Sequence, residues 1–492
     1  MEANKLSVLS LNCWGLYLVS RKRKFRLEAI AEAIRQLSCD IVTLQEIWVY
    51  QDFNHLKNHV STELPYAKYF YSGALGSGLA ILSKYPITYS SYFRYTLAGR
   101  PLKVFHGDYY VGKGCASVCL EHPLVGVIQV FTTHLHAGYG KSDEYRGHRI
   151  TESWELANIL RSAAAQGRQI IATGDFNSTP TSYNYRLLKE HAFMTDSWLE
   201  THLDSQQQNW QQTENEDLDD FIQRFGITCN SSSNTWSKHF NPQPHKRKAT
   251  GDRLDYIFYR RTPQMICTDS FVTMTKLIPG STVSYSDHFG VQSNFILNGD
   301  DDFSKHNGYM NNHYKTISTT SNASMLPPST RYPSISTSLS HPTYTALDLT
   351  TVQELILLLQ KDQLTMQRMA HRLLRTFISL VVIVLALYVA IVIVPYRVSV
   401  NQFLSHNGDG HHHDMLIVWL LPLLLGIPLI ICSVLAIVCL IVGFVFGYGE
   451  HQAMHQFVID LQTLLHGLQL RNKDSTISSS SPTTPSQLVE TL

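Results

Sequence analysis

Three features are missing from this sequence of 492 residues. No two of its 8 cysteines form a C-x-x-C pair, and no apolar signal segment opens the chain. We therefore expect reduced thiols and a catalytic part that lies in the cytosol. An excess of basic charge is also missing, because the formal net charge is only +1. Such a chain has no broad positive field for capturing nucleic acid, so we expect no nucleic-acid partner.

The length and the uneven composition predict several units. A chain of 492 residues is too long for one ordinary hydrophobic core. Residues 1–298 have the composition of a globular domain, interrupted by a polar insert at 203–220 that we expect to be a solvated loop. Residues 299–350 are rich in Ser, Thr, Asn and Pro and poor in aliphatic residues, so they predict a flexible linker.

Within the first domain, short apolar runs alternate with helical patterns. Runs such as 6–11, 41–44 and 169–173 predict buried strands, while 26–37 and 148–165 carry apolar residues at helical spacing. This mixture favours an α/β fold in which helices cover β-sheets.

Two uncharged apolar segments near the C-terminus predict a transmembrane hairpin. Segment 376–394 is about 19 residues long, which is enough to cross a ~30 Å hydrocarbon core as a helix. Segment 415–446 is longer and contains Gly426 and Pro428, which favour a tilt or a kink. We assign transmembrane helices to 376–395 and 415–447.

The charges around these spans predict their orientation. Lys and Arg flank the outer ends of both spans, whereas the loop 396–414 carries only Arg397. The positive-inside rule then places both termini in the cytosol and the loop on the far side. Residues 351–375 and 448–471 are compatible with a juxtamembrane helix and a cytosolic helix, and 472–492 with a disordered tail. Gly443 and Gly447 form a small-xxx-small pair, a weak signal for helix packing.

Polar residues end or interrupt many of the apolar runs, which suggests one site at one edge of the sheets. Each alone fits a helix cap, a turn or a buried structural carboxylate, so the set gains its weight from the series. The series consists of Asn12, Glu46, His134, His136, Asp175, Asn177, Asp255, Asp287 and His288.

These residue types suit the hydrolysis of a phosphodiester. Mg²⁺ prefers carboxylate and amide oxygens, which Glu46 and Asn12 offer. His288 is the natural general base, oriented by Asp287 or by another carboxylate. Asn177 and His134 are candidates for donating hydrogen bonds to the negative charge that develops in the transition state.

The series resembles the endonuclease/exonuclease/phosphatase superfamily, whose signatures are Gly-Asp-Phe-Asn at 174–177 and Ser-Asp-His at 286–288. Within it, the chain resembles the neutral sphingomyelinases and in particular the fungal inositol phosphosphingolipid phospholipases C. Leu-Asn-Cys-Trp-Gly at 11–15 and Thr-His-Leu-His-Ala at 133–137 support this, as do the two C-terminal spans. The resemblance implies a four-layer αββα sandwich like pancreatic deoxyribonuclease.

The resemblance also implies roles by position. Glu46 holds Mg²⁺, for which Mn²⁺ can substitute, and Asn12 helps to bind the metal or the phosphate. Asp175 and Asn177 position water and phosphate. The remaining implied roles are a general base for His288 supported by Asp287, a phosphate contact or leaving-group acid for His134, a supporting network for Asp255, and a less certain place for His136.

Two basic or glycine-rich segments have alternative interpretations. Residues 107–114 partly match a nucleotide-binding P-loop, but Gly114 stands where Ser or Thr would bind Mg²⁺. The resembling phospholipases have a similar loop, so Asp108 and Lys113 are secondary site candidates; Lys113 could contact the phosphate or pair with Asp108. The basic cluster formed by 21–24 and Arg26 is either a solvated helix start or a contact for anionic phospholipids, which often stimulate the family.

Three functions are therefore weighed. The leading hypothesis is a Mg²⁺-dependent phospholipase C that hydrolyses sphingolipid phosphodiesters, sphingomyelin or inositol phosphosphingolipids, to ceramide and a phosphorylated headgroup. A nuclease or an inositol polyphosphate phosphatase on the same fold is the second, and a non-catalytic membrane adaptor is the third. We expect a multi-pass protein of the endoplasmic reticulum, mitochondria or a related membrane, with the spans available for oligomerisation.

Overall fold

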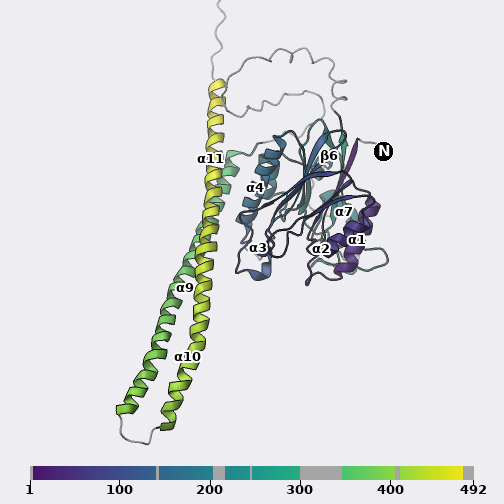
Figure 1. The fold of residues 1–492 in the computed structure, drawn as a ribbon. Coiled ribbons are helices and arrows are strands. Elements are labelled where there is room, and N and C mark those ends of the chain that lie inside the picture. Colours follow the sequence, from purple (N-terminus) through teal and green to yellow (C-terminus); the bar gives the residue numbers. More distant parts are fainter. Residues whose placement is uncertain are drawn as a thin grey trace, which may run out of the picture. The chain divides into compact units, whose positions relative to one another are not determined.

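The computed structural model describes residues 4–139, 143–202, 217–243, 247–299, 346–404 and 411–479 (Figure 1). Most of the predicted insert at 203–220, the linker at 299–350 and the tail at 472–492, and part of the loop at 396–414, lie outside these residues. The chain divides into two units. Unit 1 comprises Met1–Ala98 and Tyr110–Leu347, and unit 2 comprises Gly99–Tyr109 and Asp348–Leu492.

The first sheet of unit 1 has six strands in the order β11-β12-β1-β2-β4-β3. Its central strands β1 and β2 are parallel, and helix α1 (Arg23–Leu37) connects them. The other neighbours in this sheet are antiparallel. The strand bounds are β1 Lys5–Asn12, β2 Ile41–Gln45, β3 Tyr66–Tyr69, β4 Ala80–Ser83, β11 Met265–Thr273 and β12 Gly290–Leu297.

The second sheet has six strands in the order β5-β6-β7-β8-β10-β9. Its parallel pair is β7 and β8, which helix α4 (Arg146–Ala164) connects. The strand bounds are β5 Ile87–Arg94, β6 Gly114–His122, β7 Gly126–His134, β8 Gln169–Asp175, β9 Thr195–Asp196 and β10 Asp255–Tyr259.

The two sheets pack face to face with helices on their outer faces. Between the sheets lies a fully buried apolar layer that includes Val8, Ile81, Val130 and Ile257. Helices α1 and α2 (Tyr50–His59) cover the outer face of the first sheet, because their apolar residues share a core with Leu9 and other residues of β1, β2 and β4. Helix α4 and α5 (Tyr183–Arg186) cover the second sheet in the same way. The predicted αββα sandwich is therefore confirmed.

Short helices complete unit 1. The π-turn η2 (Leu187–His191) follows α5, and α6 (Ser197–Thr201) follows β9. Helix α7 (Leu218–Phe225) packs its apolar face against Val272 and Phe289. Helix α3 (Asp108–Val111) begins in unit 2 and ends in unit 1, and the 3-10 turn η1 (Val104–His106) lies within unit 2.

A seam of polar side chains ties one sheet to the other. Thr173 of β8 donates a hydrogen bond to Thr43 of β2, with 2.8 Å between the hydroxyl oxygens. The amide of Gln45 donates to the hydroxyl of Thr132 at 3.0 Å. Since buried polar groups must be satisfied, these bonds favour one register between the sheets over slipped alternatives.

Unit 2 consists mainly of long helices. Helix α9 spans Leu349–Leu404, and α10 (His411–Leu440) continues through the π-helix η5 (Ile441–Gly447) into α11 (Tyr448–Ser479). Gly443 and Gly447 pack against α9, because a Cβ added at Gly447 would lie 3.0 Å from the Cβ of Ala370. The small-xxx-small pair is thus used in this packing.

Two helical segments of unit 2 are long and apolar enough to cross a membrane, Leu349–Asn401 and Leu420–Asn472. Their large apolar side chains face outward: Ile378, Leu385 and Ile437 are each more than half exposed. The predicted juxtamembrane and cytosolic helices are continuous with these spans, so each forms one uninterrupted rod with its span rather than a separate element.

Candidate active site

The fold brings the ends of six strands to one edge of the sandwich. Asn12 ends β1 beside the end of β2, after which Glu46 follows. In the second sheet His134 is opposite Asp175, and Asp175 is opposite Asp255. His288 lies two residues before the start of β12 and bridges to Cys229. Each sheet therefore contributes part of one polar cluster.

Asn12 links the two sheets within this cluster. Its side-chain nitrogen donates to Asp175 Oδ2 at 3.0 Å and to Glu46 Oε1 at 3.2 Å. Its side-chain oxygen accepts the backbone N–H of Trp14 at 3.0 Å. The amide thus holds two carboxylates close together, which is the predicted meeting of Asn12, Glu46 and Asp175.

His288 and Asp255 form a buried pair. The distance from His288 Nδ1 to Asp255 Oδ2 is 2.8 Å, and His288 Nε2 lies 3.8 Å from Asp175 Oδ2. Of the two carboxylates considered for orienting His288, Asp255 makes the contact. The support of His288 by Asp287 stays a prediction, and the Asp287 carboxylate accepts a hydrogen bond from the Ser286 hydroxyl at 3.2 Å.

Burial and crowding shift the acidity of these groups. Burial, followed by repulsion from Asp287, raises the pKa of Glu46 to about 7. Burial and the neighbouring Asp255 raise the pKa of Asp175 to about 6. Burial alone would lower the pKa of His288, but the carboxylates of Asp255 and Asp175 outweigh it and raise this pKa well above its usual value. Without a bound cation, the protein therefore stabilises the ionised forms of Glu46 and Asp175 poorly.

His134 lies beside these carboxylates. Its Nε2 is 3.6 Å from Asp175 Oδ2 and 4.0 Å from Glu46 Oε1. Burial and the positive charge of Lys113 lower the pKa of His134 well below its usual value. A neutral imidazole favours the predicted role of a hydrogen-bond donor to phosphate over that of an acid with a mobile proton.

Asn177 and Lys113 converge on the chain that follows His134. The side-chain nitrogen of Asn177 donates to Leu135 O at 3.0 Å, and the buried ammonium of Lys113 donates to the same oxygen at 3.0 Å. Lys113 therefore places a positive charge next to the cluster, as expected of a secondary site residue.

Two other predicted candidates lie differently. The ring of His136 is fully buried and stacks on Tyr145 with 4.0 Å between centroids, and its Nδ1 is 2.8 Å from Ala137 O. These contacts favour a structural role for the ring. Asp108 is buried at the start of α3 within unit 2.

Arg26 was predicted only as a member of the basic cluster that is solvated or contacts anionic phospholipid, and for this residue both interpretations are wrong. It is fully buried, and its guanidinium donates to the carbonyl oxygens of Cys13 and Tyr285 at 3.0 and 2.9 Å. It also stacks over the rings of Trp14 and Trp236. Arg26 thus joins the loop after Asn12 to the segment that carries His288. The basic cluster around it concealed this role, because a sequence does not distinguish a buried arginine from solvated neighbours.

Backbone geometry at the site is unusual. Glu46 has φ 55° and Asn177 has φ 46°, both in the left-handed region that side chains rarely adopt. Gly174 has φ +141°, and a Cβ there would lie 2.0 Å from Thr133 O. The Gly-Asp-Phe-Asn motif therefore needs its glycine so that β8 can approach β7 closely enough to present Asp175.

The residues fit a bound cation. Asp175, Asp255 and His288 offer ligand atoms within 4.8 Å of one another. The buried Asp255 Oδ1 has no hydrogen-bond partner among the described residues. Glu46 and Asp175 are carboxylates whose raised pKa values a cation would reverse. The ligand role of Glu46 and Asn12 stays a prediction.

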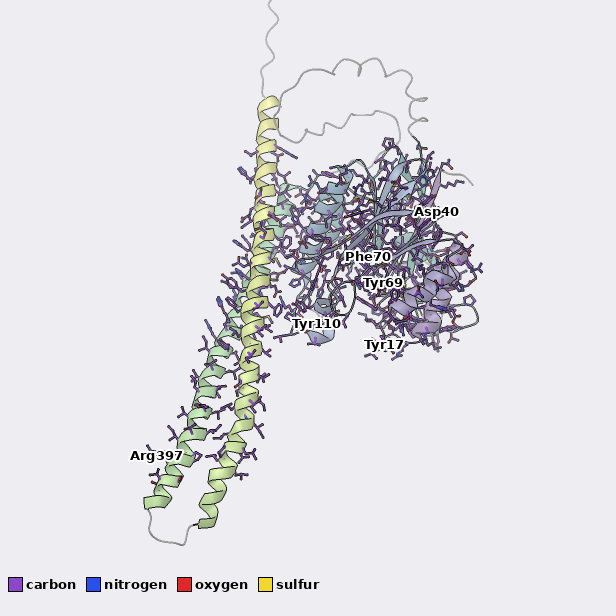
Figure 2. All side chains as sticks on the ribbon, viewed as in Figure 1. Tyr17, Asp40, Tyr69, Phe70, Tyr110 and Arg397 are labelled. Carbon is purple, nitrogen blue, oxygen red and sulfur yellow. The ribbon has the colours of Figure 1, made fainter. Side chains whose placement is uncertain are left out.

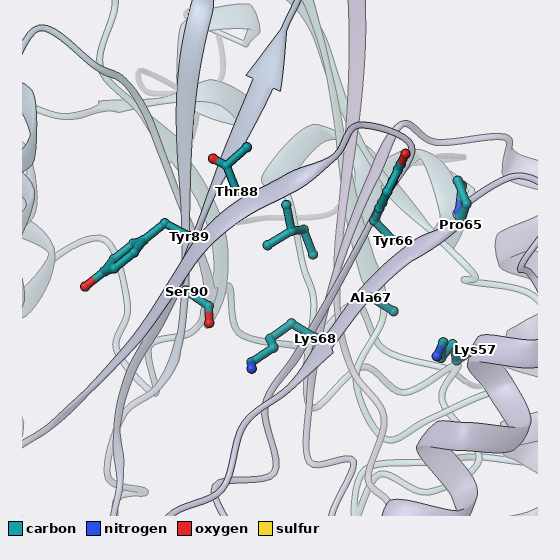
Figure 3. A pocket seen from close by; sticks show the side chains of 9 residues that line it. Lys57, Pro65, Tyr66, Ala67, Lys68, Thr88, Tyr89 and Ser90 are labelled. Atoms are coloured by element: carbon teal, nitrogen blue, oxygen red, sulfur yellow. The ribbon is translucent and has the colours of Figure 1, made fainter.

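A separate groove lies away from this cluster (Figure 3). It is an open depression of about 450 Å³ between the edge strands β3 and β5, lined by Lys57, Tyr66, Lys68 and Tyr89 among others. Tyr66 is opposite Ser83, which is opposite Ile41 at the start of β2. The groove is therefore at the opposite end of the strands from Glu46.

The chain belongs to the Endonuclease/Exonuclease/phosphatase family, whose model matches residues 9–288. It is 38% identical over 294 residues to the "Inositol phosphosphingolipids phospholipase C" of Schizosaccharomyces pombe, covering 59% of this chain and 68% of that protein. It is 32% identical over 295 residues to the human "Sphingomyelin phosphodiesterase 2", covering 60% and 65%. A truncated Caenorhabditis elegans TDP2 structure, 17% identical, covers 60% of this chain and 98% of that one with a TM-score of 0.43. The names of the Schizosaccharomyces pombe and human relatives agree with the predicted family.

Proposed function

We propose that this chain is a Mg²⁺-dependent phospholipase C that hydrolyses sphingolipid phosphodiesters to ceramide and a phosphorylated headgroup. That it is a phosphodiesterase follows from its family and from relatives named as sphingomyelin phosphodiesterase and inositol phosphosphingolipid phospholipase C. The observation that carries the proposal is the His288–Asp255 pair facing Asp175, in a chain that also has two apolar helices long enough to span a membrane.

His288 is the proposed general base. Because its Nδ1–H is directed to Asp255, its Nε2 faces Asp175. The neighbouring carboxylates raise the pKa of His288, and a cation bound among them would offset their charge and leave Nε2 unprotonated, as a general base requires. Water loses a proton to this nitrogen as its oxygen bonds to phosphorus, the bond between phosphorus and the ceramide oxygen breaks, and the ceramide oxygen takes up a proton from a solvent water molecule. The Asp255 carboxylate stabilises the imidazolium that results.

His134, Lys113 and Asn177 are proposed to stabilise the phosphate. The neutral ring of His134 donates a hydrogen bond, and the buried ammonium of Lys113 adds positive charge behind it. Bound Mg²⁺, or Mn²⁺ in its place, would neutralise a phosphate oxygen. Glu46 and Asp175 would hold it, and Asn12 would help by fixing both carboxylates through its amide N–H groups.

The anchor supports a lipid as substrate. We propose that the helices at 376–395 and 415–447 cross an intracellular membrane, of the endoplasmic reticulum or mitochondria, with the catalytic domain in the cytosol. Anionic phospholipids are proposed activators, and the spans are available for oligomerisation. A tether raises the effective concentration of enzyme at the surface that holds its substrate.

Headgroup release from liposomes of defined sphingolipids tests the proposal. The full chain, reconstituted with Mg²⁺, is expected to release phosphorylated headgroup, and EDTA is expected to abolish the release. His288→Ala should remove activity. His122→Ala is the matched control, because His122 is equally buried but lies at the far end of β6. Faster turnover of DNA or of soluble inositol phosphates than of any sphingolipid would contradict the proposal.

A further inference from the structure

The loop between β1 and α1 exposes an apolar tip. Tyr17, Leu18 and Val19 are 68%, 90% and 67% exposed, the highest run of apolar exposure among the described residues of unit 1. Figure 2 shows Tyr17 and Asp40 at opposite ends of unit 1, and Asp40 stands at the start of β2, away from the catalytic edge. The tip is therefore at the catalytic end.

The base of this tip is rigid and touches the site. The N–H of Gly15 donates to Glu46 O at 2.9 Å, and a Cβ on Gly15 would lie 2.4 Å from that oxygen. Ser20 N–H closes the turn onto Leu16 O at 3.2 Å. Arg26 holds both sides of the loop, because it donates to Trp14 O at 2.6 Å and to Arg21 O at 2.9 Å. An exposed tip with such a base is presented to solvent by the fold itself.

Basic side chains surround the tip. Arg21, Lys22 and Lys24 are exposed, and none has an ion-pair partner among the described residues. Asp52 pairs with Arg23, whose guanidinium lies over the Tyr17 ring at 5.0 Å. Glu28 is exposed one turn further along α1 and leaves the cluster positive. An anionic surface would complement this charge.

A second exposed apolar pair occupies the same end. Tyr71 and Leu75 are 69% and 59% exposed in the loop from β3 to β4. Tyr69, at the end of β3, is opposite Ala80, which is opposite Leu44 next to the site. Two loops on the catalytic edge therefore carry protruding apolar side chains. The groove with Lys57 and Lys68, by contrast, is at the other end of the strands. A membrane bound at that groove would lie far from the site.

We infer that residues Tyr17–Val19 insert into the headgroup layer of a bilayer, while Arg21, Lys22 and Lys24 bind anionic phospholipid headgroups. A protruding apolar tip surrounded by basic side chains fits a fluid bilayer surface, which can deform around it. Burial of the apolar side chains and attraction to the anionic headgroups both contribute to the binding free energy. The two apolar helices of the chain put a bilayer within reach. The inference rests on the proposed lipid substrate, because insertion beside Glu46 brings the site to the phosphodiester.

Depth-dependent fluorescence quenching tests this inference without any hydrolysis. The full chain with Leu18→Cys carries an environment-sensitive fluorophore in vesicles that contain phosphatidylserine and shallow spin-labelled lipid. The unsubstituted chain, labelled in parallel, gives the background from the native cysteines. Strong quenching is expected at position 18 and none at position 124, where Leu124→Cys places the same probe in the exposed β6–β7 turn at the opposite end.

Charge and apolar variants then separate the two parts of the surface. Arg21→Glu with Lys22→Glu should abolish the quenching at position 18, whereas Lys68→Glu, in the distant groove, should leave it intact. Leu18→Ser with Val19→Ser should lower turnover of vesicle substrate about tenfold while sparing a monomeric short-chain substrate.

Equal quenching at positions 18 and 124, or quenching that persists in purely phosphatidylcholine vesicles, would overturn the inference, and so would an equal loss on both substrates. Strong, charge-dependent quenching in a chain that cleaves no sphingolipid would support the inference and refute the proposed function instead.

Discussion

Unit 1 and unit 2 use the same apolar residue types in opposite ways. In unit 1, Leu9 and Val130 are fully buried between layers, whereas in unit 2 Ile378 and Leu385 are about 60% exposed. Water surrounds the first arrangement, and hydrocarbon is the solvent that the second one fits. The two units also differ in their buried polar groups, because unit 1 encloses Asp175, Asp255 and His288. Buried ionisable groups need partners at fixed positions, which the folded interior of unit 1 supplies. The candidate active site therefore lies in unit 1.

The largest expected effect on turnover comes from a change in this buried polar cluster. Asp255→Asn removes the charge that orients His288, and turnover should fall by about 10³-fold or more, the order found when such a carboxylate is amidated. Because no hydrogen bond joins the Asp287 carboxylate to the His288 ring among the described residues, Asp287→Asn should cost at least tenfold less. Headgroup release measures both variants, and thermal unfolding checks that they fold. Equal losses would show that Asp255 has no special relation to His288.

The same truncation should separate the two apolar arrangements. Leu9→Ala creates a cavity in the core of unit 1 and should lower the free energy of unfolding by about 2–5 kcal/mol. Leu385→Ala, at a position 58% exposed, should change the unfolding of unit 1 by less than about 0.5 kcal/mol. Thermal unfolding of the full chain in nanodiscs, followed by near-ultraviolet circular dichroism, measures both. A similar loss from both would contradict the assigned surfaces.

Packing inside unit 2 should depend on its small residues. Gly447→Leu introduces atoms where even a Cβ would lie 3.0 Å from Ala370, so helix association should weaken by about 1–3 kcal/mol. Gly449→Leu is the matched control, since a Cβ there meets nothing within 4 Å. Detergent-titrated unfolding of the reconstituted chain reports the difference. Equal stability of the two variants would show that the helices do not pack through Gly447.

The smallest expected effect is on how the stability of unit 1 depends on pH. Burial, followed by the charge of Arg161, lowers the pKa of His191 from 6.5 to about 3. The unfolded chain therefore binds a proton between these values that the folded chain does not, so stability falls as pH drops below 6.5. The slope from this group is at most about 1.4 kcal/mol per pH unit.

His191→Gln should flatten the decline of stability with acid, measured as chemical denaturation midpoints from pH 7 to pH 4. His55→Gln, at an exposed position, should leave the profile unchanged. A profile for His191→Gln that matches the parent would remove His191 as a source of acid sensitivity.

The sandwich and the clustering of the candidate site residues could be predicted from the sequence, because each rests on a local pattern. Asn12, Glu46, Asp175 and His288 follow or precede buried strands, and strand ends converge wherever sheets pair. The choice of Asp255 over Asp287 as the partner of His288 could not be predicted. It depends on how β10 meets the turn before β12, which is a contact between segments distant in sequence. Arg26 was missed for a related reason, because its burial comes from two loops more than 250 residues apart.

The seam between the sheets has a consequence for folding. Asn12 and Glu46 come from one sheet, and Asp175 and Asp255 from the other. The Thr43–Thr173 and Gln45–Thr132 bonds stand a few residues below them. A chain whose halves collapsed one step out of alignment would lose these bonds and would separate the two groups of carboxylates together. The site is therefore complete only when the two sheets are correctly aligned. We expect a misaligned folding intermediate to be catalytically inactive.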